Sequence, residues 1–288
     1  MNKWILASRP KTLPAAVSPV ILGTAMAYHD GSFHPFIFFM ILLAAVLIQT
    51  GANFANDVYD FEKGTDREDR LGPARALQSG LISPQLMKSA MWKVFALAML
   101  IGFYLAYIGG WPIVIIGLAS IAAGIAYTGG PWPLGYHGLG DLFVFLFFGI
   151  IAVSGTYYLY TETVTPIAFW AGSTMGLLST AILVVNNLRD RGTDVKSGKN
   201  TLAVRFGYSF SMMEYAACVI LPFTFPLCLW YFWDVGMAVL PTLFTLPVAV
   251  HLLVQLRSKT GRELNQVLAG TARFMFVFTL LLSGGLIL

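Results

Sequence analysis

Residues 36–66 read FIFFMILLAAVLIQTGANFANDVYDFEKGTD, and they join a long apolar segment directly to a run of carboxylates. The apolar part belongs to a span that we predict over residues 33–55, a length within the roughly 17 to 25 residues that a bilayer-crossing helix needs. Ionisable side chains beside such a segment are costly and usually mark function. The stretch therefore predicts a membrane helix that carries polar chemistry at one end.

The composition extends this prediction to the whole chain. Of its 288 residues, 57% are hydrophobic and 11% are charged, and the mean hydropathy is +0.72. Such a chain is too apolar for a soluble globular protein. We predict an all-α, polytopic membrane bundle that forms a single domain of residues 1–288. Its nine transmembrane helices are expected at residues 13–28, 33–55, 94–108, 111–127, 142–160, 167–185, 215–232, 236–256 and 267–288.

The basic residues indicate how this bundle lies in the membrane. All 18 Lys and Arg residues fall at the N-terminus or in the stretches 63–93, 189–205 and 257–273. Nine alternating spans place these groups on one face, which the positive-inside rule assigns to the cytoplasm. We therefore expect a cytoplasmic N-terminus. The lipid bilayer, rather than a nucleic acid, explains the net charge of +4.

The connections after the second and sixth predicted spans are unusually long, at roughly 35 and roughly 25 residues. Because these two spans are four apart in order, they point the same way through the membrane. This pattern predicts two four-helix halves and one additional helix.

Polar and acidic residues recur at the matching ends of these two spans. If the helices continue past the apolar segments, the spacing of three and four residues places each set on one helix face. Solvated loop charges are the usual explanation for such stretches. Their repetition at two membrane edges nevertheless favours a functional site. The two sets are Asn53, Asn56, Asp57 and Asp60, followed by Asn186, Asp190 and Asp194.

These oxygen-bearing side chains suit a hard cation. Mg²⁺ is typically held by one or two carboxylates together with phosphate oxygens of a substrate. A diphosphate needs such an ion here, because two like charges about 4 Å apart repel by about 4 kcal/mol at an effective dielectric of about 20. Neighbouring basic residues are candidates for binding the diphosphate, although each also has a topological explanation. They are Lys63, Arg70, Arg75, Arg189 and Lys199.

The two acidic motifs resemble those of a known family. NDVYDFEKGTD, at residues 56–66, is similar to the first Asp-rich motif of the UbiA superfamily of membrane prenyltransferases, and NNLRDRGTD, at 186–194, is similar to the second. The resemblance implies an Mg²⁺ cofactor and the catalytic residues Asp57, Asp60, Asp190 and Asp194. The implied metal ligands are Asn56, Asp57, Asp60, Asp66, Asp190 and Asp194.

Three flanking blocks resemble one branch of that family, whose members prenylate 1,4-dihydroxy-2-naphthoate. They are RPKTLP (9–14), DRLGPARALQSG (69–80) and GKNTLAVRFG (198–207). Asp66 follows Asp60 by six residues, whereas members acting on 4-hydroxybenzoate have a shorter spacing. The branch implies a polyprenyl diphosphate donor, release of diphosphate and CO₂, and demethylmenaquinol as product. It also implies a bacterial inner-membrane protein with its active site facing the cytoplasm.

The loop AYTGGPWPLGYHGLGD, at residues 126–141, lacks the basic residue that 4-hydroxybenzoate enzymes carry in the matching block. Acceptor recognition is therefore expected to differ here. Each candidate also has a simpler role: His137 as a loop residue, Tyr127 in an interfacial aromatic belt, and Asp141 as a helix cap. The acceptor-side candidates are Lys11, Tyr127, Tyr136, His137, Asp141, Asn186 and Asn187.

Two alternative functions remain open from the sequence. One is an enzyme of the same type with another aromatic acceptor, 4-hydroxybenzoate or homogentisate. The other is a membrane cation or lipid transporter. Because the acids gather at one membrane face rather than at the midplane, the enzyme is favoured.

Overall fold

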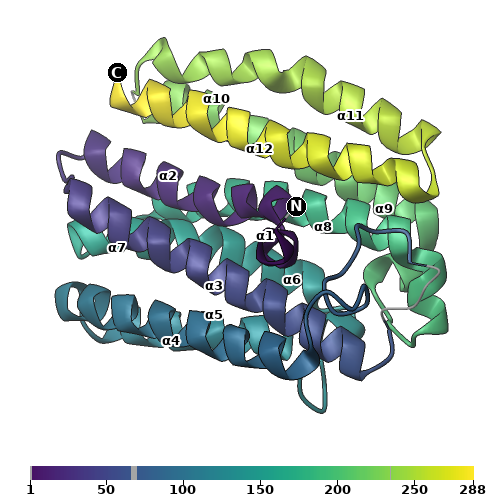
Figure 1. The fold of residues 1–288 in the computed structure, drawn as a ribbon. Helices are drawn as coiled ribbons and strands as arrows, with labels where there is room; N and C mark the ends of the chain where they lie inside the picture. Colours follow the sequence, from purple (N-terminus) through teal and green to yellow (C-terminus); the bar gives the residue numbers. More distant parts are fainter. Residues whose placement is uncertain (1, 66–69, 234) are drawn as a thin grey trace.

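A computed structural model describes residues 2–65, 70–233 and 235–288. All regular secondary structure in these ranges is helical, which confirms the predicted all-α membrane bundle (Figure 1). Within the described residues, seven helical segments are long and apolar enough to cross a bilayer. Two further predicted spans correspond to shorter helices of 17 and 16 residues, so the count of nine stays a prediction. The seven are Pro35–Glu62, Pro84–Gly109, Gly140–Thr161, Pro166–Lys196, Leu202–Phe232, Met237–Ser258 and Gly261–Ile287.

The first part of the chain forms five helices. The short α1 (Lys3–Ser8) lies across the bundle axis and leads through a 3₁₀ turn, η1 (Pro10–Thr12), into the bundle. Proline near the first position of the later helices suits helix starts, because the missing N–H has no partner there in any case. The bundle helices are α2 (Leu13–His29), α3 (Pro35–Glu62), α4 (Pro84–Gly109) and α5 (Trp111–Ala126).

The second part begins with a 3₁₀ turn, η2 (Leu134–Tyr136), and contains two composite spans. The first consists of α6 (Gly140–Phe145), a π-helical turn η3 (Leu146–Ile151) and α7 (Ala152–Thr161). The second consists of α9 (Leu202–Ile220), η4 (Leu221–Phe223) and α10 (Thr224–Phe232). The remaining elements are α8 (Pro166–Lys196), η5 (Met237–Thr245), α11 (Leu246–Ser258), η6 (Gly261–Glu263) and α12 (Leu264–Ile287).

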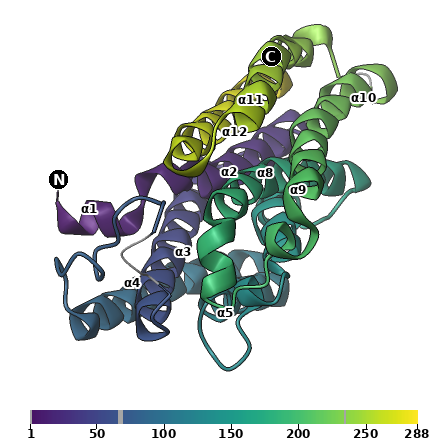
Figure 2. The same cartoon turned by 90° about the vertical axis from the view of Figure 1, so that its right-hand side faces the viewer.

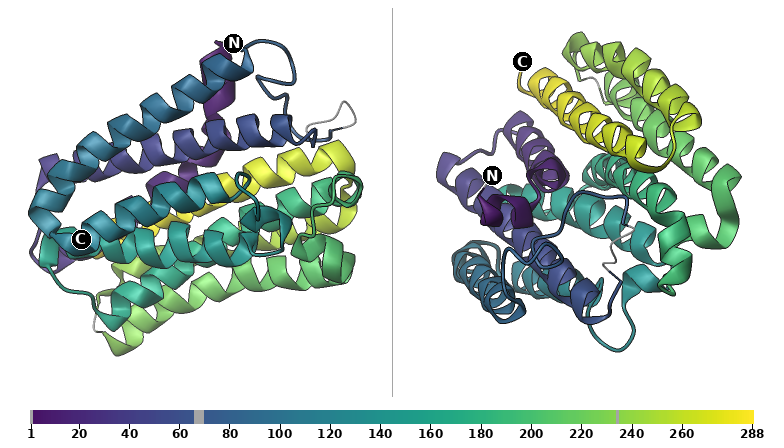
Figure 3. Two further views of the ribbon diagram at one scale, coloured as in Figure 1. Left: turned by 90° about the horizontal axis from the view of Figure 1, so that it is seen from below. Right: turned by 45° about the vertical axis from the view of Figure 1, so that its right-hand side comes forward.

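The helices run along one long axis in layers (Figures 2 and 3). Helices α2, α3 and α8 lie between α4 and α5 on one side and α11 and α12 on the other. The last helix, α12, contacts α2 from the first part of the chain and α8 and η5 from the second. It thereby joins the two parts that the sequence predicts as halves.

The helix that carries the second acidic motif is longer than predicted. Helix α8 continues to Lys196, past the predicted end at residue 185, and α9 begins at Leu202 rather than at residue 215. The expected connection of roughly 25 residues is therefore wrong, because only residues 197–201 separate the two helices. Hydropathy could not find this extension, because the added turns are polar.

Helices α3 and α8 end in the same way. After α3, Gly64 adopts φ +66°, its N–H donates to the Phe61 carbonyl, and the Thr65 N–H donates to the Asp60 carbonyl. After α8, Gly198 adopts φ +72°, its N–H donates to Val195, and the Lys199 N–H donates to Asp194. Both are Schellman motifs, in which a left-handed residue satisfies the last carbonyls of the helix. Each therefore fixes one motif aspartate at the end of a helix.

We expect Gly198→Ala to lower the free energy of unfolding by about 1–2 kcal/mol, the cost of a left-handed conformation for a residue with a Cβ. No atom lies within 4 Å of a Cβ built at Gly198, so the effect is conformational rather than steric. Gly192 is a matched control, because it lies inside α8 and is equally uncrowded. Gly192→Ala should stabilise the protein by about 0.5–1 kcal/mol. Thermal unfolding of both variants checks the prediction, and a shift of the same sign in both would contradict it.

Candidate active site

One cavity of about 490 Å³ joins the two acidic motifs to the interior of the bundle. On α3 its lining residues form a single helical stripe, from Ile41 through Ala45 and Ala52 to Asp60. This stripe extends about 28 Å at about 1.5 Å per residue, which is close to the thickness of a bilayer's hydrocarbon core. The lining is charged and polar near Asp60 and apolar towards Ile41. Its apolar wall includes the exposed side chains of Phe103 and Leu118, so the cavity reaches the lipid-facing surface.

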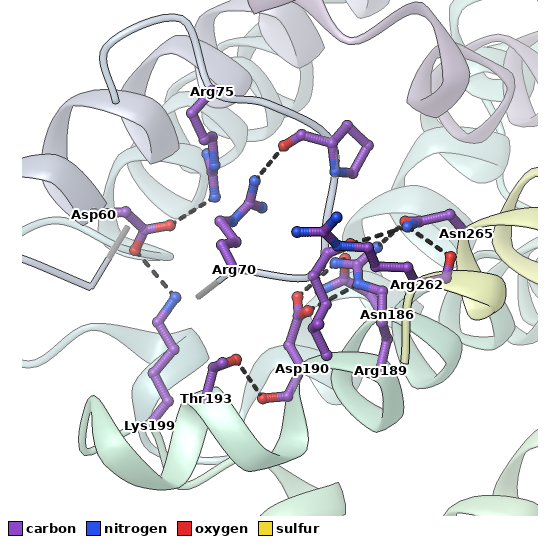
Figure 4. Close-up of polar contacts among 12 residues, drawn as sticks. Asp60, Arg70, Arg75, Asn186, Arg189, Asp190, Thr193, Lys199, Arg262 and Asn265 are labelled. Atoms are coloured by element: carbon purple, nitrogen blue, oxygen red, sulfur yellow. Dashed lines mark hydrogen bonds and ion pairs between the residues drawn. The ribbon is translucent and has the colours of Figure 1, made fainter. Parts of the chain in front are cut away.

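Asp60 belongs to the polar end of the cavity, and 1% of its surface is exposed. Figure 4 shows its contacts with Arg75 and Lys199. Its Oδ2 accepts a hydrogen bond from Arg75 Nη2 at 2.9 Å, and its Oδ1 accepts one from Lys199 Nζ at 3.1 Å. The hydroxyl of Tyr136 donates to the same Oδ1 at 2.9 Å. Arg75, Lys199 and Tyr136 all line the cavity with Asp60. Residues from four separate segments therefore meet at this carboxylate.

Asp190, in the second motif, corresponds to Asp60 in the first, and its carboxylate accepts hydrogen bonds from the adjacent Arg189. Arg189 donates from Nε to Oδ1 at 2.8 Å and from Nη2 to Oδ2 of Asp190. The same guanidinium donates to Asn186 Oδ1 and to Asn265 Oδ1, each at 2.7 Å. Asn265, on α12, donates in turn to the Leu71 carbonyl at 3.0 Å. Arg189 thus connects the second motif to α12 and to the connection that follows the first motif.

Asp194 is different, because its carboxylate makes no hydrogen bond or ion pair with the described residues. It lines the cavity, only 8% of its surface is exposed, and the Lys199 and Arg189 charges act on it from a distance. A buried carboxylate without a direct partner is costly. Asp194 is therefore the motif residue most available to a bound cation.

Asp57 lies apart from the cavity lining. Its side chain is buried, interacts with the backbone of Ala76 and Leu77, and leaves Oδ1 without a hydrogen bond. Asn56 does line the cavity and accepts a hydrogen bond from the Thr128 hydroxyl at 2.9 Å. The predicted ligand Asp66 lies outside the described residues. The metal roles of these three residues stay predictions.

The predicted diphosphate-binding residues divide into two groups. Arg70, Arg75 and Lys199 line the cavity, whereas Lys63 and Arg189 do not. The Lys63 ammonium donates to the Thr128 carbonyl at 2.7 Å and lies 4.7 Å from the centre of the Tyr136 ring. Burial lowers the pKa of Lys63 below its ordinary value. The Asp60 charge opposes this effect, and the Lys199 charge adds to it. The cations that face a substrate in the cavity are therefore those of the first group.

Four of the acceptor-side candidates line the cavity, namely Tyr127, Tyr136, Asn186 and Asn187. The other three candidates lie outside the lining. Lys11 is exposed, Asp141 is buried at the start of α6, and His137 stacks on Trp132 with ring centres 4.3 Å apart.

Sequence reasoning missed several residues of the site. Asn265 lies outside both acidic motifs, so nothing in the sequence connects it to Arg189, its partner in the structure. Arg9 lines the cavity and was assigned only to topology. Its loop is tied to α3 because Asn53 donates to the Ser8 carbonyl at 2.9 Å and to the Thr12 hydroxyl at 3.2 Å. The RPKTLP block, which begins at Arg9, was the available signal.

The oxygen donors of the cavity fit Mg²⁺ if a substrate completes the coordination. Asn56 and Asp60 come from α3, and Asp190 and Asp194 come from α8. In the part of the chain that the structure describes, no three His, Cys, Asp or Glu side chains lie close enough to hold an ion by themselves. One or two carboxylates with phosphate oxygens supply the usual magnesium ligands. The donor set is therefore suited to an ion that arrives with a phosphate-bearing substrate.

The fold and the site together define a multi-pass membrane protein whose cavity suits an amphiphile with an anionic head and a long apolar tail. The chain belongs to the UbiA prenyltransferase family, whose model matches residues 16–280.

Curated relatives narrow the comparison. The chain is 42% identical over 224 residues to 1,4-dihydroxy-2-naphthoate octaprenyltransferase from Escherichia coli, a match that covers 76% of this chain and 72% of the relative. It is 38% identical over 290 residues to the protein of that name from Mycobacterium tuberculosis, covering 99% and 96%. The Haemophilus influenzae protein of that name is 34% identical over 302 residues, covering 100% and 96%.

Solved structures show the same fold. A UbiA homologue from Archaeoglobus fulgidus bound to DMAPP and Mg²⁺ superposes with a TM-score of 0.71 at 14% identity, covering 99% of each chain. The same homologue bound to GPP and Mg²⁺ gives a TM-score of 0.68 at 14% identity, covering 98% of this chain and 100% of the other.

Proposed function

We propose that this protein transfers a polyprenyl chain from a polyprenyl diphosphate to 1,4-dihydroxy-2-naphthoate, releasing diphosphate and CO₂ and giving demethylmenaquinol. The observation that carries the proposal is one shared cavity, in which carboxylates from both motifs lie at the head of a long apolar passage. The names of the bacterial relatives support the acceptor. The ligands of the structural neighbours support an allylic diphosphate with Mg²⁺.

The residues at the polar end have two proposed roles, binding the metal and binding the diphosphate. Asp60, Asp190 and Asp194, with Asn56, would hold Mg²⁺, which when bound neutralises charge that grows on the departing diphosphate. Arg70, Arg75 and Lys199 are placed to donate charge-assisted hydrogen bonds to its free oxygens. Such preorganised groups lower the barrier because they are aimed at charge that develops during the reaction. The departing diphosphate would replace Asp60 as the partner of Arg75 and Lys199.

The rest of the cavity serves the two organic groups. The prenyl chain lies along the small apolar residues of α3, and the lipid-facing opening admits it without passage through water. The acceptor ring then lies near Tyr127, Tyr136 and Asn187, where it attacks the first carbon of the prenyl chain. We further propose that the chain acts as one domain in the bacterial inner membrane, with this end facing the cytoplasm.

Purified protein supplied with Mg²⁺, a polyprenyl diphosphate and 1,4-dihydroxy-2-naphthoate should release diphosphate and CO₂ and form a prenylated naphthoquinol. Chelation of the metal should stop the reaction. Parallel reactions with 4-hydroxybenzoate and homogentisate are expected to give little product. Faster reaction with either one would reassign the acceptor, and absence of product with all three from folded protein would remove the proposed activity.

A further inference from the structure

A second cavity, of about 390 Å³, lies between α11 and α12, outside the active site. Helix α11 contributes Val248 and Leu252 to its walls, its C-terminal cap contributes Lys259, and α12 contributes Arg273, Phe274 and Val277. We call this cavity the α11–α12 groove. Gly270 helps to form it, because a Cβ at that position would lie 2.7 Å from Leu252 Cδ2. Neither acidic motif reaches this groove, so the proposed reaction does not account for it.

Arg273 is the unusual member of this groove. It lies nine residues after Leu264, the first residue of α12, which is about 13 Å into a helix that is long and apolar enough to span a bilayer. Its side chain is exposed, and it forms no hydrogen bond or ion pair with any residue that the structure describes. An outward-facing charge inside a membrane helix is costly unless it finds a counterion. The protein supplies none, because the described residues that line the groove include no acid.

Lys259 adds a second positive charge at the end of the groove. It is the C-terminal cap of α11, and its ammonium donates to Gln266 Oε1 at 2.8 Å and to Gln255 Oε1 at 3.3 Å. These neutral partners orient the ammonium without neutralising it. His251 also lines the groove, and its Nε2 lies 2.7 Å from Gln255 Nε2. The groove therefore has a positively charged mouth.

The remaining wall is mainly apolar, with Thr245 as a polar residue at its far end. Val248 precedes Lys259 by eleven residues on α11, and Val277 follows Leu264 by thirteen on α12. These offsets place Val248 and Val277 about 16–20 Å from the mouth, deeper than Arg273 at about 13 Å. A phospholipid has two parts that match this arrangement. Its phosphate headgroup suits the positive charge at the end of the helix pair, and its acyl chain suits the apolar groove behind that charge.

We propose that the α11–α12 groove binds an anionic phospholipid, with its phosphate at Lys259 and Arg273 and one acyl chain along Val248, Phe274 and Val277. The phosphate supplies the counterion that Arg273 lacks, through the charge-assisted hydrogen bonds that guanidinium forms with phosphate. A small free anion would satisfy the charges alone. The lipid also covers the apolar wall, which is why we favour it.

The test uses native mass spectrometry to measure binding by the protein in neutral detergent. Phosphatidylglycerol, phosphatidylcholine and inorganic phosphate are titrated separately. Phosphatidylglycerol should bind at least about tenfold more tightly than phosphatidylcholine, and Lys259→Gln/Arg273→Gln should remove most of that preference. Lys3→Gln/Arg257→Gln is the matched control, because it removes the same charge from exposed residues outside both cavities and should keep the preference. Turnover in the same detergent should be unchanged in the groove variant.

Four results would overturn the proposal. The first is that both lipids bind equally well to the unmodified protein. The second is an equal loss of binding in both double variants, which would indicate general surface charge. The third is that inorganic phosphate displaces phosphatidylglycerol at similar concentration, and the fourth is that a second copy of the chain occupies the groove. If the groove variant does not fold, Arg273→Lys and Arg273→Gln replace it, and only the glutamine variant should lose binding.

Discussion

Asp194→Asn is expected to reduce the rate of prenyl transfer by about a hundredfold to a thousandfold, the usual cost of removing one preorganised electrostatic group. The stability of the substrate-free protein should not fall. Asp194 is buried in the cavity wall, and its carboxylate has no direct partner among the described residues. Replacing it with a neutral side chain of the same shape therefore removes a desolvated charge and breaks no ion pair. Initial rates and thermal unfolding in the same detergent measure the two effects.

Two further variants make this result specific. Glu62→Gln removes a carboxylate from the end of α3, but Glu62 is exposed and, among the described residues, pairs only with Lys88 at 3.4 Å, so neither rate nor stability should change. Asp60→Asn should lower both, because Asp60 is the partner of Arg75 and Lys199. An Asp194→Asn variant that keeps activity within about threefold of the original would remove Asp194 from the metal site.

The outline of the site could be predicted from the sequence because its two parts are local repeats. Asn56 and Asp60 on α3, and Asn186, Asp190 and Asp194 on α8, are spaced at four residues, and the helices that carry them persist to Glu62 and Lys196. Helical periodicity then places those side chains on one face. The contact between Asp60 and Lys199 joins residues 139 positions apart in the sequence, so neither periodicity nor hydropathy predicts it.

Other parts of the site depend on packing that the sequence does not contain. Asp57 belongs to the first motif, but its side chain is buried against Ala76 and Leu77 in the following connection. The sequence predicts that Arg189 binds the diphosphate, from its position beside Asp190, whereas in the structure it lies outside the cavity lining and also donates to Asn265 on distant α12. A motif therefore identified the neighbourhood of these residues, while their partners depend on how distant helices pack.

Arg189→Leu is expected to lower the free energy of unfolding by about 3–5 kcal/mol, the cost of breaking a buried ion pair and leaving one charge alone. The Arg189 side chain is 1% exposed, and it donates to Asp190, Asn186 and Asn265 at the same time. The variant leaves the Asp190 carboxylate without its guanidinium and releases α12 from the second motif. Arg189→Lys should restore only part of the loss, because a single ammonium cannot reproduce the guanidinium fork. Thermal or denaturant-induced unfolding measures both changes.

The double variant Arg189→Leu/Asp190→Leu separates this structural role from diphosphate binding. Removing both members of a buried pair leaves no uncompensated charge, so stability should recover by several kcal/mol relative to Arg189→Leu alone. Turnover should be lost in the double variant, because Asp190 belongs to the proposed metal site. If Arg189 instead served to bind the diphosphate, Arg189→Leu would raise the KM for the prenyl diphosphate with little change in stability. That outcome would require Arg189 to leave Asp190 and turn into the cavity when the substrate binds.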